Sequence, residues 1–254
     1  MRTYTASGIV LHRTLLGEAD KILTLFTREH GKISAVAKGS RRPSSRLSGV
    51  TELFTDAKYL MSRGRSLDVI SQCEIVHSYP ALRLNLELIA RATYLCELLD
   101  RMTMPHDATA AESIHTLTSL ALMVLERADG YPDGVLHSYE LHLLKELGYE
   151  PNLDKCSVCG RPAESRSSAF SAMQGGLLCS EDRLRARDSC AVSSDAIELL
   201  RILRDSDIEQ ILTIRPVTRI AIEIDRILRP YIALRLDRPL KSADFLEEIR
   251  SQSR

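Results

Sequence analysis

The hydrophobic period of the chain changes near residue 81, and this change limits the possible folds more than any other feature. Before it, short alternating apolar runs predict five strands, at residues 7–13, 21–28, 32–38, 51–61 and 67–76. Turn signals at Gly17, Gly31, the 39–49 loop and Gly64 separate these strands. Five short strands in about 80 residues are enough for a small closed barrel such as an OB-fold. The pattern alone fits an SH3-like barrel or a small sandwich as well.

The remainder of the chain has a helical period. One helix is expected to run to about Leu99, and a second to begin at Thr109, with Glu112 completing a capping box. A third helix should begin after Pro132 and end at Gly148. Near the end, Pro216 should open a long helix that Pro230 kinks or ends. We expect these amphipathic helices to pack mainly against one another and form a core.

The charge of the chain is divided between these two parts. The whole sequence has 34 basic and 34 acidic side chains, but residues 1–80 hold twelve Lys/Arg and seven Asp/Glu, a net charge of +5. The rest of the chain therefore carries −5. Four cations, Lys38, Arg41, Arg42 and Arg46, lie in one Gly-, Ser- and Pro-containing loop without an acidic residue. A basic first part with such a loop favours an anionic partner over a merely solvated surface.

A cysteine motif interrupts the helical part. Cys156 and Cys159 are spaced C-x2-C, and Cys179 follows after nineteen residues, at the end of a hairpin predicted around Gln174 to Gly176. This spacing is typical of a zinc ribbon, in which two knuckles present four ligands. The fourth cysteine is replaced by Asp182, whose carboxylate can also bind zinc. Two alternatives remain: Cys190 or His142 supplies the fourth ligand, or the knuckle keeps its shape by packing alone. Cys73 and Cys96 are expected to be buried small hydrophobic residues.

Catalytic motifs are missing from the sequence. It contains no phosphate-binding G-x-x-x-x-G-K-[ST] loop, no H-E-x-x-H helix, no G-x-S-x-G elbow and no H-x-E motif of a zinc deaminase. We therefore expect a protein that is not an enzyme. The absence of a signal peptide and of a run of about 20 apolar residues predicts a cytoplasmic protein with reduced cysteines.

Several segments, in order and spacing, resemble the RecO family of bacterial DNA repair and recombination mediators. The segments are GIVLHRTLLGEADKILTLFTREHGKISAVAKGSRRPSSRLSG at 8–49, YLCELL at 94–99, LLKELGYEP at 143–151, FSAMQGGLLC at 170–179 and LKSADFL at 240–246. The resemblance implies an α+β protein with a five-stranded OB-fold barrel at 1–80 and a helical domain at 81–254. It further implies a zinc-finger-like insertion at 152–190. Its four-cysteine zinc site carries over to Cys156, Cys159 and Cys179, and Asp182 departs from it.

The resemblance also implies a function. The family binds single- and double-stranded DNA, anneals complementary strands and works with RecR to load RecA onto DNA coated by single-strand-binding protein, whose C-terminal tail is an expected partner. Its basic residues after the third strand correspond here to Lys38, Arg41 and Arg42. We expect these residues, Arg46, Arg63 and Arg65 to form one electropositive face. Tyr59 or Phe54 could add base stacking, although both are expected in the core.

Two other functions fit the sequence pattern. In the first, the protein is an interaction scaffold whose basic barrel binds an acidic peptide or RNA. In the second, it is a zinc-dependent hydrolase. The dependence of DNA affinity on salt separates the first from DNA binding, and metal analysis with a hydrolysis screen tests the second.

Overall fold

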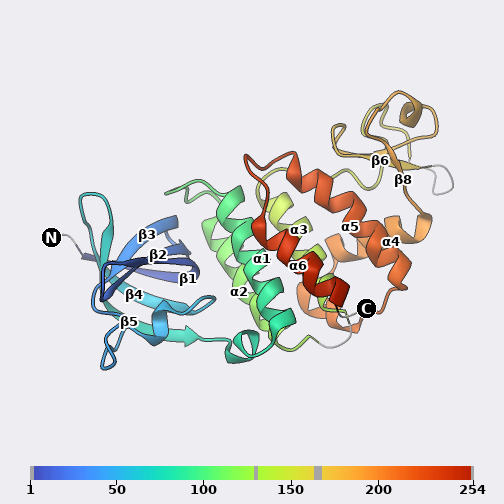
Figure 1. Ribbon diagram of the computed structural model, residues 1–254. Coiled ribbons are helices and arrows are strands. Elements are labelled where there is room, and N and C mark those ends of the chain that lie inside the picture. Colours follow the sequence, from blue (N-terminus) through green and yellow to red (C-terminus); the bar gives the residue numbers. More distant parts are fainter. Residues whose placement is uncertain (1–2, 129–130, 163–167, 253–254) are drawn as a thin grey trace. The chain divides into compact units, whose positions relative to one another are not determined.

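Five antiparallel and parallel strand pairings close a barrel at the start of the chain (Figure 1). The computed structural model describes residues 3–128, 131–162 and 168–252. The barrel strands are β1 (Thr3–Leu16), β2 (Asp20–Thr27), β3 (Gly31–Ala37), β4 (Asp56–Ser62) and β5 (Asp68–His77), in the order β1-β2-β3-β5-β4. This is the five-stranded closed barrel of an OB-fold. It confirms the expected fold class and excludes the small sandwich.

The long strand β1 makes closure possible because its two halves pair with different neighbours. Its first half pairs with β4, from Thr3 opposite Ser62, and its second half pairs with β2, up to Leu16 opposite Asp20. A bulge between Val10 and His12 marks the bend. Alternate inward side chains fill the interior, as listed here: Val10, Leu23, Leu25, Ile33, Ala35, Tyr59, Met61 and Ile70. Tyr59 and Phe54 are buried, so neither can stack on a base.

The parallel pair β3–β5 is short. It joins only Ala35 to Asp68 and Val36 to Val69. The expected strand over 51–61 is shorter in the structure, because residues 49–51 form a 3-10 helix and β4 begins at Asp56. The segment between β3 and β4 therefore remains loop over most of its length.

Three helices pack with the barrel in one compact unit, which comprises residues 1–126 and 240–254. They are α1 (Leu86–Met102), α2 (Ala111–Glu126) and α6 (Lys241–Gln252). Asn85 caps α1 by accepting hydrogen bonds from two backbone N–H groups. The expected capping box at Thr109 is wrong: α2 begins at Ala111, and Glu112 forms an ion pair with Arg28 of the barrel.

The second compact unit comprises residues 127–239. Its helices are α3 (Pro132–Glu146), α4 (Ser194–Asp205) and α5 (Thr218–Ala233). As expected, Pro132 opens α3, and Gly148 follows it with a left-handed backbone, φ 78°. Helix α5 continues past Pro230 to Ala233, so this proline lies inside the helix. The expected boundary at residues 80/81 divides the sequence patterns, whereas the compact units divide after Glu126; that boundary stays a prediction.

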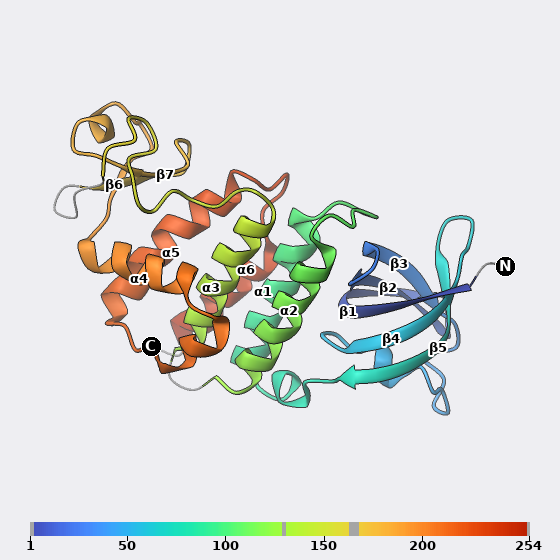
Figure 2. The same ribbon diagram turned by 180° about the vertical axis from the view of Figure 1, so that it is seen from behind.

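A small sheet completes the second unit. It consists of β6 (Ala169–Ser171), β7 (Gly176–Leu178) and β8 (Cys190–Ala191), with β6 in the middle. Figure 1 labels β6 and β8, and Figure 2 labels β6 and β7. The pair β6–β7 is the predicted hairpin, with Gly175 in its turn and Gly176 at the start of β7, both at positive φ. Among the described helices, none is long and apolar enough to cross a membrane.

Candidate DNA-binding surface and metal site

The four cations of the 38–46 loop, called here the loop patch, extend from the end of β3. Lys38, Arg41, Arg42 and Arg46 are all exposed. The loop is fixed to the turn between β1 and β2, because the backbone N–H of Gly39 donates to Asp20 (2.7 Å) and Arg41 Nη1 donates to the Gly17 carbonyl (3.1 Å). The loop patch therefore projects its charge from an anchored backbone.

Arg63 and Arg65, called here the turn pair, lie between β4 and β5 and are also exposed. The Arg63 guanidinium lies 5.1 Å from the ring centroid of Tyr4, at the start of β1. The loop patch is anchored beyond the other end of β1, at Gly17. The two groups of cations are thus attached to opposite ends of the same strand. That all six form one electropositive face stays a prediction.

The cations of the loop patch and the turn pair differ from most other barrel cations in their partners. Within the described residues, none of the six has a carboxylate oxygen within 4 Å, whereas four other barrel cations are ion-paired. Those four are Arg13 and Lys21 with Glu52, Arg28 with Glu112, and Lys32 with Asp100. An exposed cation without a carboxylate partner can neutralise a phosphate without first breaking an ion pair.

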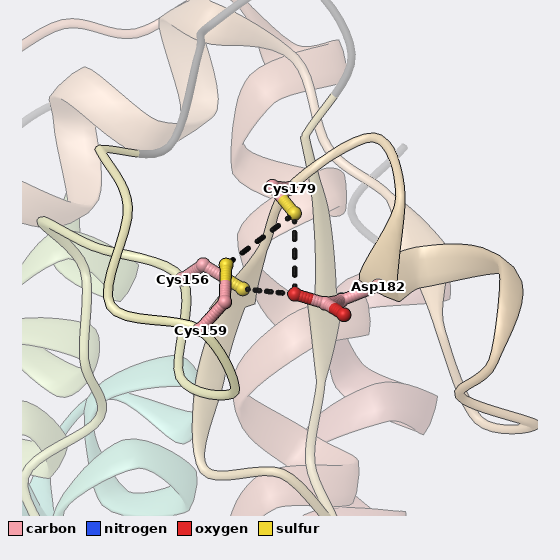
Figure 3. A group of neighbouring side chains, drawn as sticks. All are labelled: Cys156, Cys159, Cys179 and Asp182. Atoms are coloured by element: carbon pink, nitrogen blue, oxygen red, sulfur yellow. Dashed lines mark hydrogen bonds between the residues drawn. The ribbon is translucent and has the colours of Figure 1, made fainter.

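The structure brings together the cysteines of the predicted zinc ribbon. The Sγ atoms of Cys156, Cys159 and Cys179 and a carboxylate oxygen of Asp182 all lie within 4.8 Å of one another (Figure 3). Cys159 Sγ is 3.8 Å from Cys179 Sγ, and Asp182 Oδ2 is 3.2 Å from Cys156 Sγ and 3.3 Å from Cys179 Sγ. In a tetrahedral zinc site with Zn–S bonds of about 2.3 Å, sulfur atoms are about 3.8 Å apart. The four side chains therefore fit a metal ion of this size and preference.

Local backbone geometry holds the first knuckle in place. The Cys156 N–H donates to the Arg161 carbonyl (2.8 Å), and the Gly160 N–H donates back to the Cys156 carbonyl (2.9 Å). Gly160 has φ 72°, which glycine adopts at little cost. The Ser157 N–H donates to the carbonyl of Leu177 in β7, so the knuckle is joined directly to the hairpin that carries Cys179.

Asp182 reaches the cysteines because the chain turns into a 3-10 helix, Asp182–Leu184, directly after the hairpin. Its side chain is buried, with 6 % of the residue exposed. Hydrogen bonds from the thiols of Cys159, Cys156 and Cys179 hold the pKa of Asp182 below its ordinary value. Burial opposes ionisation of the Cys156 thiol, but backbone N–H groups of Cys159, Cys179 and Val158 outweigh it and lower the pKa of Cys156.

A charged residue supports the site from outside. Arg161 donates from Nε to Cys159 Sγ (3.4 Å) and forms an ion pair with Glu181 (2.6 Å). A hydrogen bond to a ligand sulfur orients it and offsets part of its negative charge. Cys190 and His142 do not belong to the cluster: Cys190 lies in β8, and His142 Nδ1 is 2.7 Å from the carbonyl of Ser138 in its own helix.

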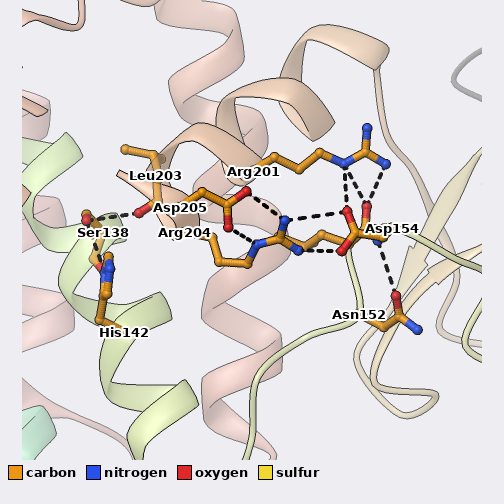
Figure 4. Close-up of polar contacts among 9 residues, drawn as sticks. Ser138, His142, Asn152, Asp154, Arg201, Leu203, Arg204 and Asp205 are labelled. Carbon is orange, nitrogen blue, oxygen red and sulfur yellow. Dashed lines mark hydrogen bonds and ion pairs between the residues drawn. The ribbon is translucent and has the colours of Figure 1, made fainter. Parts of the chain in front are cut away.

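The cysteine cluster is attached to the helices of its unit through residues 152–154. Arg204 of α4 binds Asp154 (2.8 Å) and Asp205 (2.7 Å) (Figure 4). Arg201 of the same helix donates to the Leu153 carbonyl (2.8 Å). The Asn152 carbonyl in turn accepts the N–H of Leu177. The segment that leads into the first knuckle is therefore held on one side by α4 and on the other by the hairpin.

Comparison with known proteins finds matches to one protein family over nearly the whole chain. The family profile described as Recombination protein O N terminal matches residues 1–79, and Recombination protein O C terminal matches residues 83–244. The chain belongs to the RecO family. It is 39 % identical over 253 residues to the DNA repair protein RecO of Symbiobacterium thermophilum, covering 99 % of each chain. It is 38 % identical to that of Pelotomaculum thermopropionicum (97 % of this chain, 94 % of the relative) and 37 % identical to that of Bifidobacterium adolescentis (97 % and 100 %). RecO membership supports a role in DNA repair and recombination.

Proposed function

We propose that this RecO-family chain is a cytoplasmic, non-catalytic mediator of recombination. It binds single- and double-stranded DNA, anneals complementary strands and, with RecR, helps to load RecA onto single strands coated by single-strand-binding protein, whose C-terminal tail it contacts. The observation that supports DNA binding best is the set of six exposed barrel cations, none of which has a carboxylate partner among the residues that the structure describes. Such side chains hold phosphates irrespective of base sequence, which a mediator that acts on any broken chromosome requires.

Annealing fits the same surface. Two complementary strands repel each other through their phosphates, and a protein that neutralises part of this charge lets them meet. No bond has to be broken or formed for this step. Separate cation groups at the two ends of β1 would allow contact with more than one strand.

The test is fluorescence anisotropy of labelled single-stranded DNA at several salt concentrations. We expect Arg41→Glu/Arg42→Glu to bind more weakly and to lower the slope of log K against log salt by about 1.4, because each phosphate contact contributes about 0.7 on single strands. The matched control is Arg219→Glu/Arg238→Glu, which reverses two exposed charges in the second unit. If the wild-type protein and the loop-patch variant bind DNA alike, the assignment of the loop patch is wrong. If RNA or an acidic peptide binds better than DNA, the protein is the interaction scaffold described above rather than a DNA-binding mediator.

For the cysteine cluster we infer a structural zinc ion, held by Cys156, Cys159, Cys179 and Asp182. The donor set supports zinc because three thiolates favour a soft or borderline metal over Mg²⁺ or Ca²⁺. Four protein ligands leave no open position for water, so the bound ion would cross-link the knuckle and the hairpin rather than activate a nucleophile.

A further inference from the structure

Two of the three cysteines in the cluster are accessible, and their sulfur atoms face each other. Cys159 is exposed and Cys179 is half-buried, whereas Cys156 is buried, with 1 % of the residue exposed. The Sγ atoms of Cys159 and Cys179 lie 3.8 Å apart (Figure 3). An oxidant in solution therefore meets Cys159 first, and Cys179 is the thiol next to it.

Backbone hydrogen bonds bring these two cysteines together. The Ser157 N–H donates to the Leu177 carbonyl (2.8 Å), and each of the two cysteines follows one of these residues by two positions. The knuckle and the end of the hairpin thus run side by side up to the two sulfur atoms. Sulfur atoms that are 3.8 Å apart need only small side-chain rotations to reach the S–S bond length of about 2.0 Å.

The other two members of the cluster leave this pair as the one that can react. Asp182 stands where a zinc ribbon has its fourth cysteine, so position 182 offers no sulfur for a second disulfide. Cys156 is buried and its thiol donates to Asp182 (3.2 Å). Arg161 Nε donates to Cys159 Sγ (3.4 Å) and holds this sulfur beside Cys179. Oxidation should therefore give one product.

We propose that Cys159 and Cys179 are a site of reversible oxidation, which closes to a disulfide when the protein meets hydrogen peroxide. In the first step the Cys159 sulfur takes one oxygen atom from the peroxide, which gives a sulfenic acid and one water molecule. In the second step the Cys179 sulfur attacks this sulfur, the S–S bond forms and a second water molecule leaves. The two thiols lose two electrons and two protons, and one molecule of peroxide takes up both. Disulfides of cytosolic proteins are usually transient ones of this kind.

The disulfide would change the surroundings of Asp182. The Cys179 thiol donates to Asp182 Oδ2 (3.3 Å), and a disulfide sulfur has no hydrogen to donate. A buried carboxylate that loses its donors is costly, so we expect the 3-10 helix Asp182–Leu184 to open and the carboxylate to move into water. The reaction needs only the two thiols and does not rest on the zinc inferred above. A metal ion held by the cluster would lose two of its four ligands in the same step.

The first test treats the reduced full chain with one equivalent of hydrogen peroxide and maps disulfides by mass spectrometry of unreduced peptides. We expect the link between Cys159 and Cys179 to be the main disulfide and a thiol reductant to reverse it. Protein as purified and protein stripped by a chelator should both form it. The matched control is Cys190→Ser, which replaces a half-buried cysteine outside the cluster and should form the same link.

Three results would overturn the proposal. They are a disulfide that joins other cysteines or two chains, oxidation of Cys159 beyond sulfenic acid without a link, and absence of the link from either the purified or the stripped protein.

The second test follows hydrogen exchange of the amides of residues 183–185. These N–H groups donate to the carbonyls of Cys179, Glu181 and Asp182, at 3.1, 3.3 and 3.1 Å. We expect exchange to be about tenfold faster or more after oxidation, because opening of the 3-10 helix breaks these hydrogen bonds. Cys159→Ser keeps Cys179 but cannot form the link, so peroxide should leave its exchange unchanged. Equal exchange in oxidised and reduced wild-type protein would refute the proposed effect of the site on Asp182.

Discussion

Replacing Gly31 by alanine should destabilise the first unit more than the same change at Gly17. Both glycines have left-handed backbones, with φ 62° and φ 58°, so both variants carry the cost of a Cβ in this conformation. This cost is about 1–2 kcal/mol and is offset in part by the lower entropy of the unfolded alanine chain. The two positions differ only in what surrounds them.

A Cβ at Gly17 would meet no atom within 4 Å, whereas a Cβ at Gly31 would lie 1.9 Å from the Asp107 carbonyl oxygen. The clash is with backbone, so the α1–α2 connection must move away from β3. That movement breaks the hydrogen bond from His106 to Lys32, which contributes about 1 kcal/mol. We therefore expect a loss of about 1 kcal/mol for Gly17→Ala and about 2 kcal/mol for Gly31→Ala.

The assay is urea unfolding followed by far-UV circular dichroism, because the chain has no tryptophan. Hydrogen exchange of residues 103–110 reports whether the connection has moved. If the free energies of unfolding of the two variants agree within about 0.5 kcal/mol, the close contact between Gly31 and Asp107 does not hold the connection in place, and our reasoning about this contact is wrong.

Two further predictions concern the second unit. Asp182→Cys should raise zinc affinity about tenfold or more, because thiolate is the better zinc ligand, and Asp182→Ala should lower it. Competition with a chromogenic chelator measures both affinities. Equal zinc affinities of the wild type and Asp182→Ala would show that Asp182 is not a ligand. Burial of His137 opposes its protonation, but the hydrogen bond and charge of Asp225 (3.1 Å) outweigh this and raise the pKa of His137. Protonated His137 therefore stabilises the folded protein. This contribution is complete below about pH 6.5, the pKa of an unfolded histidine, and is lost as the pH rises through the higher pKa of the folded state. His137→Gln should therefore cost more stability at pH 6 than at pH 8.5, and an equal cost at both pH values would contradict the assignment.

The sequence predicted the barrel well because its signals are local. Gly17 and Gly31 separate β1, β2 and β3, and both adopt the positive φ that only glycine takes easily. The strand expected over 51–61 was too long at its start, since residues 49–51 turn into a 3-10 helix. The parallel pair β3–β5, which closes the barrel, joins residues that are far apart in sequence and leaves no local signal.

The candidate sites divide in the same way. The C-x2-C spacing, the hairpin and the position of Asp182 three residues after Cys179 predicted all four members of the cysteine cluster, because the 3-10 turn that brings in Asp182 follows within three residues of Cys179. Glu112 was misassigned because its partner Arg28 is 84 residues away in sequence. The contact between Lys32 of β3 and His106 of the α1–α2 connection was not predicted, because only the folded chain brings these two segments together.

The position of α6 has a consequence for the order in which the protein can fold during its synthesis. This helix packs with α1, and Glu97 of α1 accepts the backbone N–H of Ser242 (2.8 Å) and of Lys241. The residues from Leu240 on are translated only after the whole of the second unit. During synthesis the barrel, α1 and α2 therefore leave the ribosome before α6 has been made. Until α6 is added, the apolar face of α1 that packs against it stays uncovered. A nascent chain stopped before Leu240 would carry the loop patch but an incomplete first unit, which makes that stage of synthesis the one at which a chaperone is most useful.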